Sequence, residues 1–262
     1  MLRKISNENS SSIFSYRDVL IKPLSDDKFL VVGCDSSGSV GPKPEDLIRV
    51  SGEVLGKFIV RTALMEILAV RAKPLCIACG LGVEPKPTGA SILRGIKREM
   101  RKVGLNPKCD LVISTEKNFS TIQTGIGVAA IGLVEKSELL IGKCEKGDTV
   151  IGIGLPSVGM EVIENERKNA IADLEDLLKL LSMTPLGFVH AIIPVGSKGI
   201  GYEVNVLAKE SKLKLRFREQ VPVNLDKSAG PSTVILAAIK EDYYRTLKSL
   251  FKKPIYEVAT LI

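Results

Sequence analysis

Histidine and aromatic residues are scarce in this chain. Its 262 residues include one histidine, and Phe, Trp and Tyr together make up 5% of them. With a single histidine, a tetrahedral zinc site would lack ligands. The aromatic side chains are too few, and too far from any run of basic residues, to indicate a base-stacking surface for nucleic acid. We therefore expect no nucleic-acid partner. The net charge of +7 is compatible with anionic metabolites or with a lysine-rich surface that has no specific role.

Long apolar runs and a disulfide framework are absent as well. A membrane-spanning helix needs about 18 consecutive apolar residues, and no such stretch occurs. The N-terminus turns polar after Ile5 and lacks the apolar core of a secretory signal. Five cysteines at irregular spacing argue against paired disulfides, and we interpret Cys76 and Cys79 as buried structural thiols. The expectation is a cytoplasmic enzyme or binding protein without a membrane partner.

Helical and strand patterns alternate along the chain, which indicates an α+β fold. We expect helices over residues 51–70, 88–103, 165–181 and 242–251, a short helix after Gly199, and strands over residues 29–33, 74–83, 111–114, 125–134, 149–154, 188–195, 213–218 and 233–239. The polar segment 143–147 predicts a boundary between two domains, 1–145 and 146–262, and residues 7–12 are expected to form a flexible leader.

The segment that follows the first of these strands combines the groups that a Mg²⁺-bound polyphosphate needs. An aspartate, three serines, two glycines and a lysine occur within nine residues: Asp35, Ser36, Ser37, Gly38, Ser39, Gly41 and Lys43. An acid at the end of a buried strand is costly unless a metal, a charge or backbone donors hold it. Glycines let the backbone approach a ligand closely. A plain surface turn is the commoner explanation of such a segment, and it stays open here.

Two further acids have unusual placements. Glu66 lies inside the apolar segment 51–70, which also contains Arg61, and Glu116 follows the strand 111–114. Acids are rarely buried unless they are paired or bound to a metal. Together with Asp35 they could supply hard oxygen ligands for Mg²⁺. For each acid alone, a salt bridge or an exposed strand end remains the alternative, and Arg61 is expected to form a structural ion pair, with Glu66 as one candidate partner.

The second half offers weaker signals. The glycine turn 196–201 opens a helix and could cradle an anion, and the polar loop 228–232 precedes a strand. Both could hold a substrate, and both could be ordinary turns, which is the interpretation we favour. His190 lies in an apolar strand and reads as a satisfied core histidine rather than a catalytic base.

The acidic motifs resemble a known superfamily, which contains aminoimidazole ribonucleotide synthetase, selenophosphate synthetase, the hydrogenase-maturation dehydratase and thiamine-monophosphate kinase. Residues 35–43 are similar to its Asp-Gly-x-Gly-x-Lys type motif after a strand. Residues 65–75 are similar to its Asn-Asp-Leu/Ile helix end, and residues 113–116 stand in for its Gly-Gly-Asp/Glu-Thr turn. Glu66 replaces the usual Asp of that helix, and Ser-Thr-Glu replaces Gly-Gly-Asp. The resemblance covers nearly the whole chain, more loosely in the last part.

The resemblance implies a fold, a dimer and a set of ligands. The N-terminal domain would pair with a partner's copy into a β-barrel, a second α+β domain would pack alongside, and ATP would lie near the dimer interface. The implied Mg²⁺ ligands are Asp35, Glu66, Glu116 and, more weakly, Asp18. Asp35 and Lys43 would be the catalytic residues, and the nucleotide would contact Ser36, Ser37, Gly38, Gly41, Lys43, Thr115 and Asn118.

Within the superfamily, residues 34–38, 84–89 and 114–118 look most like the branch that phosphorylates α-ribazole for salvage of the lower ligand of cobalamin. The first hypothesis is therefore ATP- and Mg²⁺-dependent phosphoryl transfer to a hydroxyl of a ribosyl compound. Another ATP-dependent activation, of the cyclo-ligase or dehydratase type, is the second. A nucleotide-binding protein of the same fold without catalytic activity is the third.

Overall fold

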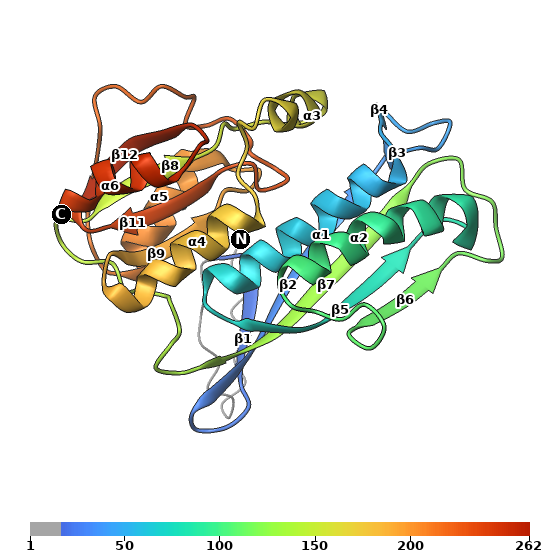
Figure 1. Ribbon diagram of the computed structural model, residues 1–262, viewed down its shortest axis with the longest axis horizontal. Coiled ribbons are helices and arrows are strands. Elements are labelled where there is room, and N and C mark those ends of the chain that lie inside the picture. The colour runs from blue at the N-terminus through green and yellow to red at the C-terminus, as the bar shows by residue number, and fades with distance from the viewer. Residues whose placement is uncertain (1–16) are drawn as a thin grey trace.

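The computed structural model describes residues 17–262, in which two sheets of five strands each carry the helices. The two sheets lie side by side in the molecule (Figure 1). The last strand of the first sheet ends at Glu135 and the first strand of the second begins at Thr149, so the expected division at 145/146 falls in the connection between them. The leader expected at residues 7–12 lies outside the described residues.

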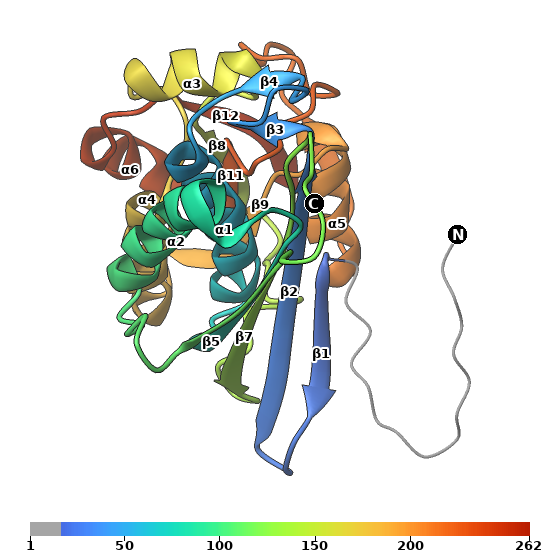
Figure 2. The same ribbon diagram turned by 90° about the vertical axis from the view of Figure 1, so that its right-hand side faces the viewer.

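The N-terminal sheet is mixed, in the order β1-β2-β7-β5-β6. All neighbouring strands are antiparallel except β5 and β6, which are parallel. Helices α1 and α2 both lie on one face of this sheet (Figure 2). The elements are β1 (Val19–Pro23), β2 (Lys28–Gly38), α1 (Gly52–Ala69), β5 (Lys73–Leu81), α2 (Ala90–Lys102), β6 (Leu111–Thr115) and β7 (Gly125–Glu135), with a turn at Pro85–Gly89 and a small parallel ribbon of β3 (Val40–Gly41) and β4 (Ile48–Arg49).

The C-terminal sheet is antiparallel throughout, in the order β10-β12-β8-β11-β9. It consists of β8 (Thr149–Ile153), β9 (Val189–Pro194), β10 (Leu215–Phe217), β11 (Ile235–Ile239) and β12 (Ile255–Leu261). Its helices are α3 (Met160–Arg167), α4 (Leu174–Met183), α5 (Gly199–Glu210) and α6 (Tyr244–Leu250), with short turns at Thr184–Leu186 and Glu241–Tyr243. The α+β architecture of two domains is therefore as expected.

Helix α1 is enclosed on several sides, which explains why its sequence is apolar almost all round. It starts at Ser51, whose hydroxyl accepts a hydrogen bond from the Val54 N–H at 3.3 Å. The helix packs on β2 and β7, on α2, and on β9 and α4 of the other sheet. One continuous core cluster accordingly contains side chains from both sheets. The helix expected over residues 51–70 is confirmed.

Two expectations about the fold need correction. The single helix expected over 165–181 is two helices, because the Asp173 carboxylate accepts hydrogen bonds from the N–H groups of Glu175 and Asp176 and starts α4 anew. Strands β1 and β12 were not expected, since both interrupt their apolar residues with charged or small ones. The N-terminal sheet of one chain is open, with β1 and β6 as its edges, so the expected barrel would need a partner's copy.

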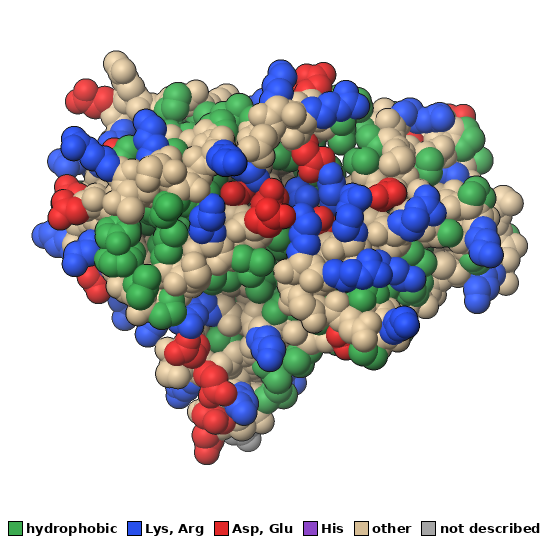
Figure 3. Space-filling model, in the orientation of Figure 1, with side chains coloured by type: hydrophobic (Ala, Val, Ile, Leu, Met, Phe, Trp, Pro, Cys, Tyr) green, Lys and Arg blue, Asp and Glu red, His purple; other side chains and the backbone are tan. Residues whose placement is uncertain are grey.

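The outer face of α2 is charged. Lys and Arg side chains, with Asp and Glu among them, spread over the face of the molecule that α1 and α2 form (Figure 3). Arg98 of α2 lies 2.7 Å from Glu53 of α1, and Arg94 lies 3.7 Å from the same carboxylate. These are exposed pairs of small energetic value. Among the described helices, none is long and apolar enough to cross a membrane.

Helices α1 and α2 approach each other closely because glycines occupy their contact. A Cβ atom at Gly56 would lie 2.0 Å from the Ile92 carbonyl oxygen, and one at Gly95 would lie 2.0 Å from the Glu53 carbonyl oxygen. Both neighbours are backbone atoms of regular helices, which cannot move without shifting the whole helix. The two glycines therefore fix how deeply α2 covers α1.

We expect Gly56→Ala to destabilise the protein by about 2 kcal/mol, because the added methyl group forces the two helices apart. The matched control is Gly201→Ala in α5, where a Cβ would meet its nearest neighbours at 3.7 Å and helix propensity favours alanine. Urea unfolding of both variants and of the wild type measures the difference. Equal stability of Gly56→Ala and the wild type would show that the helix contact is looser than the structure has it.

Candidate functional site

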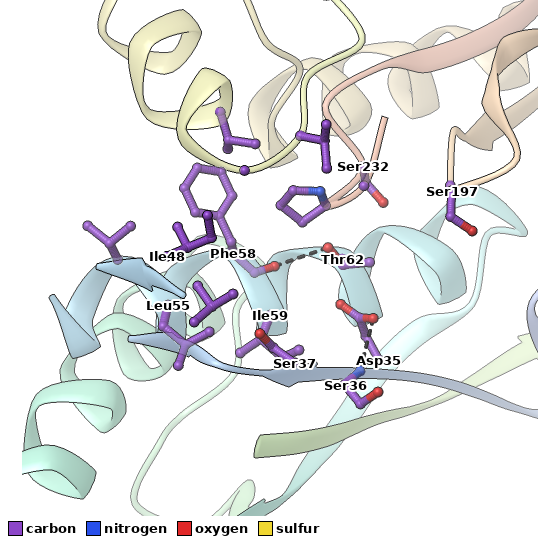
Figure 4. A pocket seen from close by; sticks show the side chains of 18 of the residues that line it. Asp35, Ser36, Ser37, Ile48, Leu55, Phe58, Ile59, Thr62, Ser197 and Ser232 are labelled. Atoms are coloured by element: carbon purple, nitrogen blue, oxygen red, sulfur yellow. Dashed lines mark hydrogen bonds between the residues drawn. The ribbon is translucent and has the colours of Figure 1, made fainter. Parts of the chain in front are cut away.

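A cavity of about 570 Å³ lies between the two halves of the chain. Strand β2, helix α1 and the β3–β4 ribbon form one wall, and the segments around residues 158–163, 196–197 and 230–232 form the other. Figure 4 shows side chains of both walls, such as Asp35 of one and Ser232 of the other, directed into the space between them, whereas Ser36 lies on the opposite side of β2 from Asp35. Polar residues gather at one end of this cavity and apolar residues at the other.

The polar end is built where β2 passes α1 at close range. A Cβ atom at Gly33 would lie 3.0 Å from the Ala63 carbonyl oxygen and 3.2 Å from the Cβ of Glu66, so only glycine allows this approach. Asp35 follows on the same face of β2, two residues further on. The carboxyl groups of Asp35 and Glu66 thereby border one cavity. Asp18, Ser36, Ser37, Thr62, Ser197 and Ser232 complete its polar lining.

Burial raises the pKa values of the carboxyl groups at this end. Burial, and then the charges of Asp18 and Glu203, raise the pKa of Glu66 to about 8. Burial raises the pKa of Asp35 to about 6, although hydrogen bonds from Ser36 and Thr62 act in the opposite direction. Burial and Asp18 raise the pKa of Glu203, which borders a smaller adjoining cavity with Asp18 and Glu66, to about 7. At neutral pH, Glu66 therefore holds its proton unless a cation replaces it, Glu203 is partly protonated, and Asp35 is mostly ionised.

No lysine or arginine of residues 17–262 forms an ion pair with Asp35 or Glu66. Arg17 lowers the pKa of Glu66 from nearby, but its guanidinium binds the Glu210 carboxylate at 2.9 Å, with both side chains almost fully buried. A buried acid without a basic partner is costly in its charged form. In such an environment a bound metal ion stabilises the charged form of a carboxylate most strongly.

The donors at the polar end fit Mg²⁺ as a partial ligand set. Within the described residues, no three His, Cys, Asp or Glu side chains are arranged to hold a metal ion by themselves. Proteins usually bind Mg²⁺ through one or two carboxylates, and water and substrate phosphates supply the remaining oxygens. Asp35 and Glu66 offer two such carboxylates. A phosphate-bearing ligand would have to complete the site.

The other end of the cavity is apolar. The aromatic ring of Phe58 and several aliphatic side chains line it, from α1, the β3–β4 ribbon and the start of α3 (Figure 4). They are Val40, Ile48, Val50, Val54, Leu55, Phe58, Ile59, Val162 and Ile163, with Pro231 opposite. An apolar pocket beside a polar one suits a ligand with a hydrocarbon or heteroaromatic part and a hydroxylated or charged part.

The rest of the expected phosphate loop lies elsewhere. Strand β2 continues to Gly38, so the first part of the expected loop is strand, and between Asp35 and Lys43 only Ser36, Ser37 and Val40 border the cavity. Gly41 has φ of 150° and packs so closely on Thr124 that a Cβ would lie 2.6 Å from the threonine hydroxyl. Lys43 Nζ lies 2.5 Å from Glu84 Oε2. Although burial opposes it, hydrogen bonds from Lys43 and Thr88 lower the pKa of Glu84 to about 2.

Glu116 is also separated from the other acids. Its carboxylate accepts hydrogen bonds from the N–H groups of Asn118 at 2.7 Å and Phe119 at 3.2 Å, which lower its pKa. Its own N–H donates to the carbonyl groups at the end of β5. Glu116, Thr115 and Asn118 do not border the cavity. The structure therefore brings together Asp18, Asp35 and Glu66, but not Glu116.

Glu203 is the acidic residue that the sequence analysis missed. It is buried in α5, and its carboxylate lies beside the backbone of Gly196. The signal was available, because Glu203 is an acid within an apolar helical stretch, as Glu66 is. Arg61 forms a structural pair as expected, but with Glu99 at 3.0 Å rather than with Glu66.

The surroundings of His190 and Cys79 favour structural roles for both residues. His190 Nδ1 lies 2.9 Å from the Asp148 carboxylate, outside both cavities. Cys79 is buried, and burial raises its pKa to about 12, which makes a reactive thiolate unfavourable. Both observations agree with the interpretations given from sequence. Cys76, however, is only half-buried, so the interpretation as a buried thiol is wrong for that residue.

Solved structures match this architecture along nearly the whole chain. A thiamine-monophosphate kinase from Stenotrophomonas maltophilia K279a has 14% identity and a TM-score of 0.61, and the match covers 97% of this chain and 89% of that one. HypE of E. coli, a hydrogenase maturation protein, has 15% identity and a TM-score of 0.62 over 88% of this chain and 79% of that one. PurL of T. maritima, solved with ADP, has 16% identity and a TM-score of 0.65 over 97% of this chain and 43% of its own.

The chain has the aminoimidazole ribonucleotide synthetase-like fold. At these identities the similarity extends to the fold and does not select a branch. The sequence matches no protein-family model and no curated protein.

The raised pKa of Glu66 predicts a pH dependence of stability in buffer that contains EDTA. Below about pH 4.5 the Glu66 carboxyl group is protonated in the folded and unfolded states alike, so its contribution to the stability of the folded state is fully present. Between that value and about 8 the unfolded chain releases the proton first, so the stability of the wild type falls as pH rises. Glu66→Gln removes this loss and should raise Tm at pH 8 relative to the wild type.

Thermal unfolding between pH 5 and pH 9 measures how Tm changes with pH in the wild type and in Glu66→Gln. The control is Glu164→Gln, a change of an exposed residue on α3, which should follow the wild type. A lower Tm of Glu66→Gln at pH 8, with an unchanged slope, would mean that the carboxylate is held in its charged form by a partner.

Proposed function

We propose that this protein is an ATP- and Mg²⁺-dependent phosphotransferase that acts on a hydroxyl of a ribosyl compound. The observation that carries the proposal is the divided cavity, with unpaired carboxyl groups at one end and an apolar pocket at the other. The fold supports it, since solved structures of this fold include a thiamine-monophosphate kinase and a protein solved with ADP. The sequence resemblance suggests α-ribazole as the acceptor, and the apolar end would take its base.

The residues of the polar end would act by positioning and by charge. Asp35 and Glu66, with Asp18 beside them, would hold Mg²⁺, which when bound neutralises phosphate charge as the phosphoryl group is transferred. Asp35 would also accept the proton of the acceptor hydroxyl. Ser36 and Ser37 would donate hydrogen bonds to the nucleotide. Phosphoryl transfer depends mainly on the alignment of the two substrates, so no nucleophilic side chain is needed.

Lys43 and Glu116 can contact the nucleotide or the metal ion only under a further condition. Lys43 is bound to Glu84, so it would reach a phosphate only by sharing or leaving that carboxylate. Glu116 lies at the C-terminal end of β6, an edge strand of the N-terminal sheet. We retain both, together with Gly38, Gly41, Thr115 and Asn118, as nucleotide or metal contacts in a site that a second copy of the chain completes.

A second copy is favoured by the uncovered face of the N-terminal sheet. On the face opposite α1 and α2, residues of all five strands are apolar and at least partly exposed: Leu20, Leu30, Val32, Cys76, Ala78, Val112, Ala129, Ile131 and Leu133. Leu20 is 57% exposed and Val112 is 66% exposed. Sheets of this kind are normally covered on an apolar face.

We expect the wild type to be a dimer of the 28.3 kDa chain and the double variant Leu20→Glu, Val112→Glu to be a monomer, because each dimer would bury four added carboxylates. Light scattering after size-exclusion chromatography measures the mass. Leu186→Glu, a change of an equally exposed leucine in the C-terminal half, is the control that should remain dimeric. A monomeric wild type at micromolar concentration would refute the dimer.

For the activity itself, ATP consumption with α-ribazole, thiamine monophosphate and related ribosides should identify an acceptor. Asp35→Asn should lower kcat/KM by at least about a hundredfold, since it removes charge at the reacting phosphate. Asp26→Asn, an exposed aspartate in the β1–β2 turn, is the matched control and should keep full activity.

Product analysis separates the proposed reaction from the alternative. A stable phosphomonoester supports the kinase. ADP and phosphate with a rearranged product would instead support the cyclo-ligase or dehydratase type, for which the exposed Cys34 at the cavity is the candidate residue. If calorimetry detects no binding of Mg²⁺ and ATP to the wild type, both enzymatic proposals fail.

A further inference from the structure

The hydroxyl group of Ser232 has no hydrogen-bond partner within residues 17–262, although the residue is only 2% exposed. Buried hydroxyls are normally bonded, so an unbonded one calls for an explanation. Ser232 borders the large cavity, and its Oγ is turned toward the side on which Ser197 and Asp35 lie (Figure 4). Its backbone has φ of 49°, a left-handed conformation that is unfavourable for serine.

A second set of free donors lies on the same wall of the cavity. Helix α5 begins at Gly199, and the preceding residues Gly196 and Ser197 border the cavity. The Gly196 backbone lies beside the Glu203 carboxylate, and the Gly199 N–H donates to the Gly196 carbonyl. The N–H groups of Ser197 and Lys198 have no acceptor in the described part of the chain. Free N–H groups at the start of a helix attract anions.

The two loops that carry these donors are bonded to each other. The Ala229 N–H donates to the Gly196 carbonyl oxygen at 3.2 Å, and the Thr233 N–H donates to the Ala229 carbonyl oxygen at 2.7 Å. The Thr233 hydroxyl also accepts a hydrogen bond from the Ser157 N–H at 3.0 Å. Ser232 Oγ is therefore held at a fixed place relative to the start of α5. Donors with fixed positions are what a bound oxyanion requires.

We propose that Ser232 Oγ and the N–H groups of Ser197 and Lys198 form a subsite for a phosphate group on the C-terminal wall of the cavity. The occupant would be either the terminal phosphate of a nucleotide or the phosphate of a phosphorylated small molecule. The Asp35 carboxylate, and Glu66 in its ionised form, stand on the opposite wall and would repel a bare phosphate. Binding should thus require Mg²⁺ between the walls, and in this respect the inference rests on the proposed function.

The test compares Ser232→Ala with the wild type and with Ser249→Ala, a serine of α6 outside the cavity. Calorimetry with Mg²⁺ present measures the affinity for three probes separately: inorganic phosphate, ribose 5-phosphate and ATP. Loss of one hydrogen bond to a charged oxygen weakens binding by about tenfold. We expect that loss in Ser232→Ala for every probe that reaches the subsite, and none in Ser249→Ala. Without Mg²⁺ the wild type should bind phosphate at least tenfold more weakly, by the same charge argument.

The stability of the ligand-free variant separates a ligand-binding role from a structural one. Because Ser232 Oγ makes no internal hydrogen bond, Ser232→Ala should unfold at the wild-type temperature or above it. A clear fall in Tm would show that the hydroxyl has an internal partner and would overturn the inference.

The probes also distinguish the inference from the proposed function. If ATP fails to bind but ribose 5-phosphate or phosphate binds and depends on Ser232, the subsite is supported and the nucleotide function is refuted. If ATP binds equally to Ser232→Ala and to the wild type, and so do the other probes, the subsite is refuted while the proposed function stands. If Ser232→Ala weakens the binding of ATP alone, the subsite holds a phosphate of the nucleotide. If it weakens the binding of ribose 5-phosphate alone, the subsite holds the phosphate of the second substrate.

Discussion

The close approach of helix α1 to its neighbours is the constraint on which the rest of the structure depends. On one side, Gly33 lets β2 come within contact of the α1 backbone, and on another, Gly56 and Gly95 let α2 lie against it. An α-helix enclosed in this way can carry apolar residues on nearly every face. The C-terminal sheet then packs on what remains of the α1 surface, through β9 and α4. The same contact determines the geometry of the site, since Asp35 and Glu66 border one cavity near the place where β2 and α1 approach most closely.

The distribution of basic side chains distinguishes Asp35 and Glu66 from other acids of the chain. The chain has an excess of basic residues, and several of its other buried acids are matched by specific cations. Arg61 pairs with Glu99, and Lys253 lies 2.5 Å from both Asp173 and Asp176. Within the described residues, Asp35 and Glu66 stand apart from this pattern because no basic side chain forms an ion pair with them. Asp46, which is also buried, is satisfied by hydrogen bonds from Thr124 and from the Lys43 N–H. Asp35, Glu66 and Glu203 border the two cavities without an ion pair in the described part of the chain, and they are the acids that a cation from outside the chain would stabilise.

Much of the fold could be read from the sequence because its main elements have strong local signals. Helix α1 was found through its uninterrupted apolar length, and its start at Ser51 follows from the capping preference of serine. The break between α3 and α4 was missed, since it depends on hydrogen bonds of Asp173 that compete with helix continuation. Strand β12 was missed because its position between β8 and β10 is set by tertiary pairing rather than by its own pattern.

The site was harder to predict, for a related physical reason. Sequence order suggested that Asp35, Glu66 and Glu116 converge, and the first two do, because neighbouring elements hold them. Glu116 is held instead by the N–H groups of its own turn, a local interaction, and Lys43 by Glu84, which lies 41 residues further along the chain. Such partners decide where an isolated charge goes, and the sequence pattern does not reveal them. Glu203 and Ser232 come to the site from the other half of the chain, and only the packing of the two sheets brings them there.

That packing also determines how the site can work. Two domains joined by a small polar contact usually move relative to each other. Here the two sheets share one continuous core around α1, and a buried ion pair, Arg17 with Glu210, ties the segment before β1 to α5. Sliding one half against the other would expose apolar surface and separate a buried charge pair, which is costly. The walls of the cavity are therefore set at a fixed distance before any ligand arrives. A fixed cavity selects ligands by shape and by the placement of its donors and acceptors, which is the arrangement that favours transfer between two aligned substrates over a reaction that depends on domain closure.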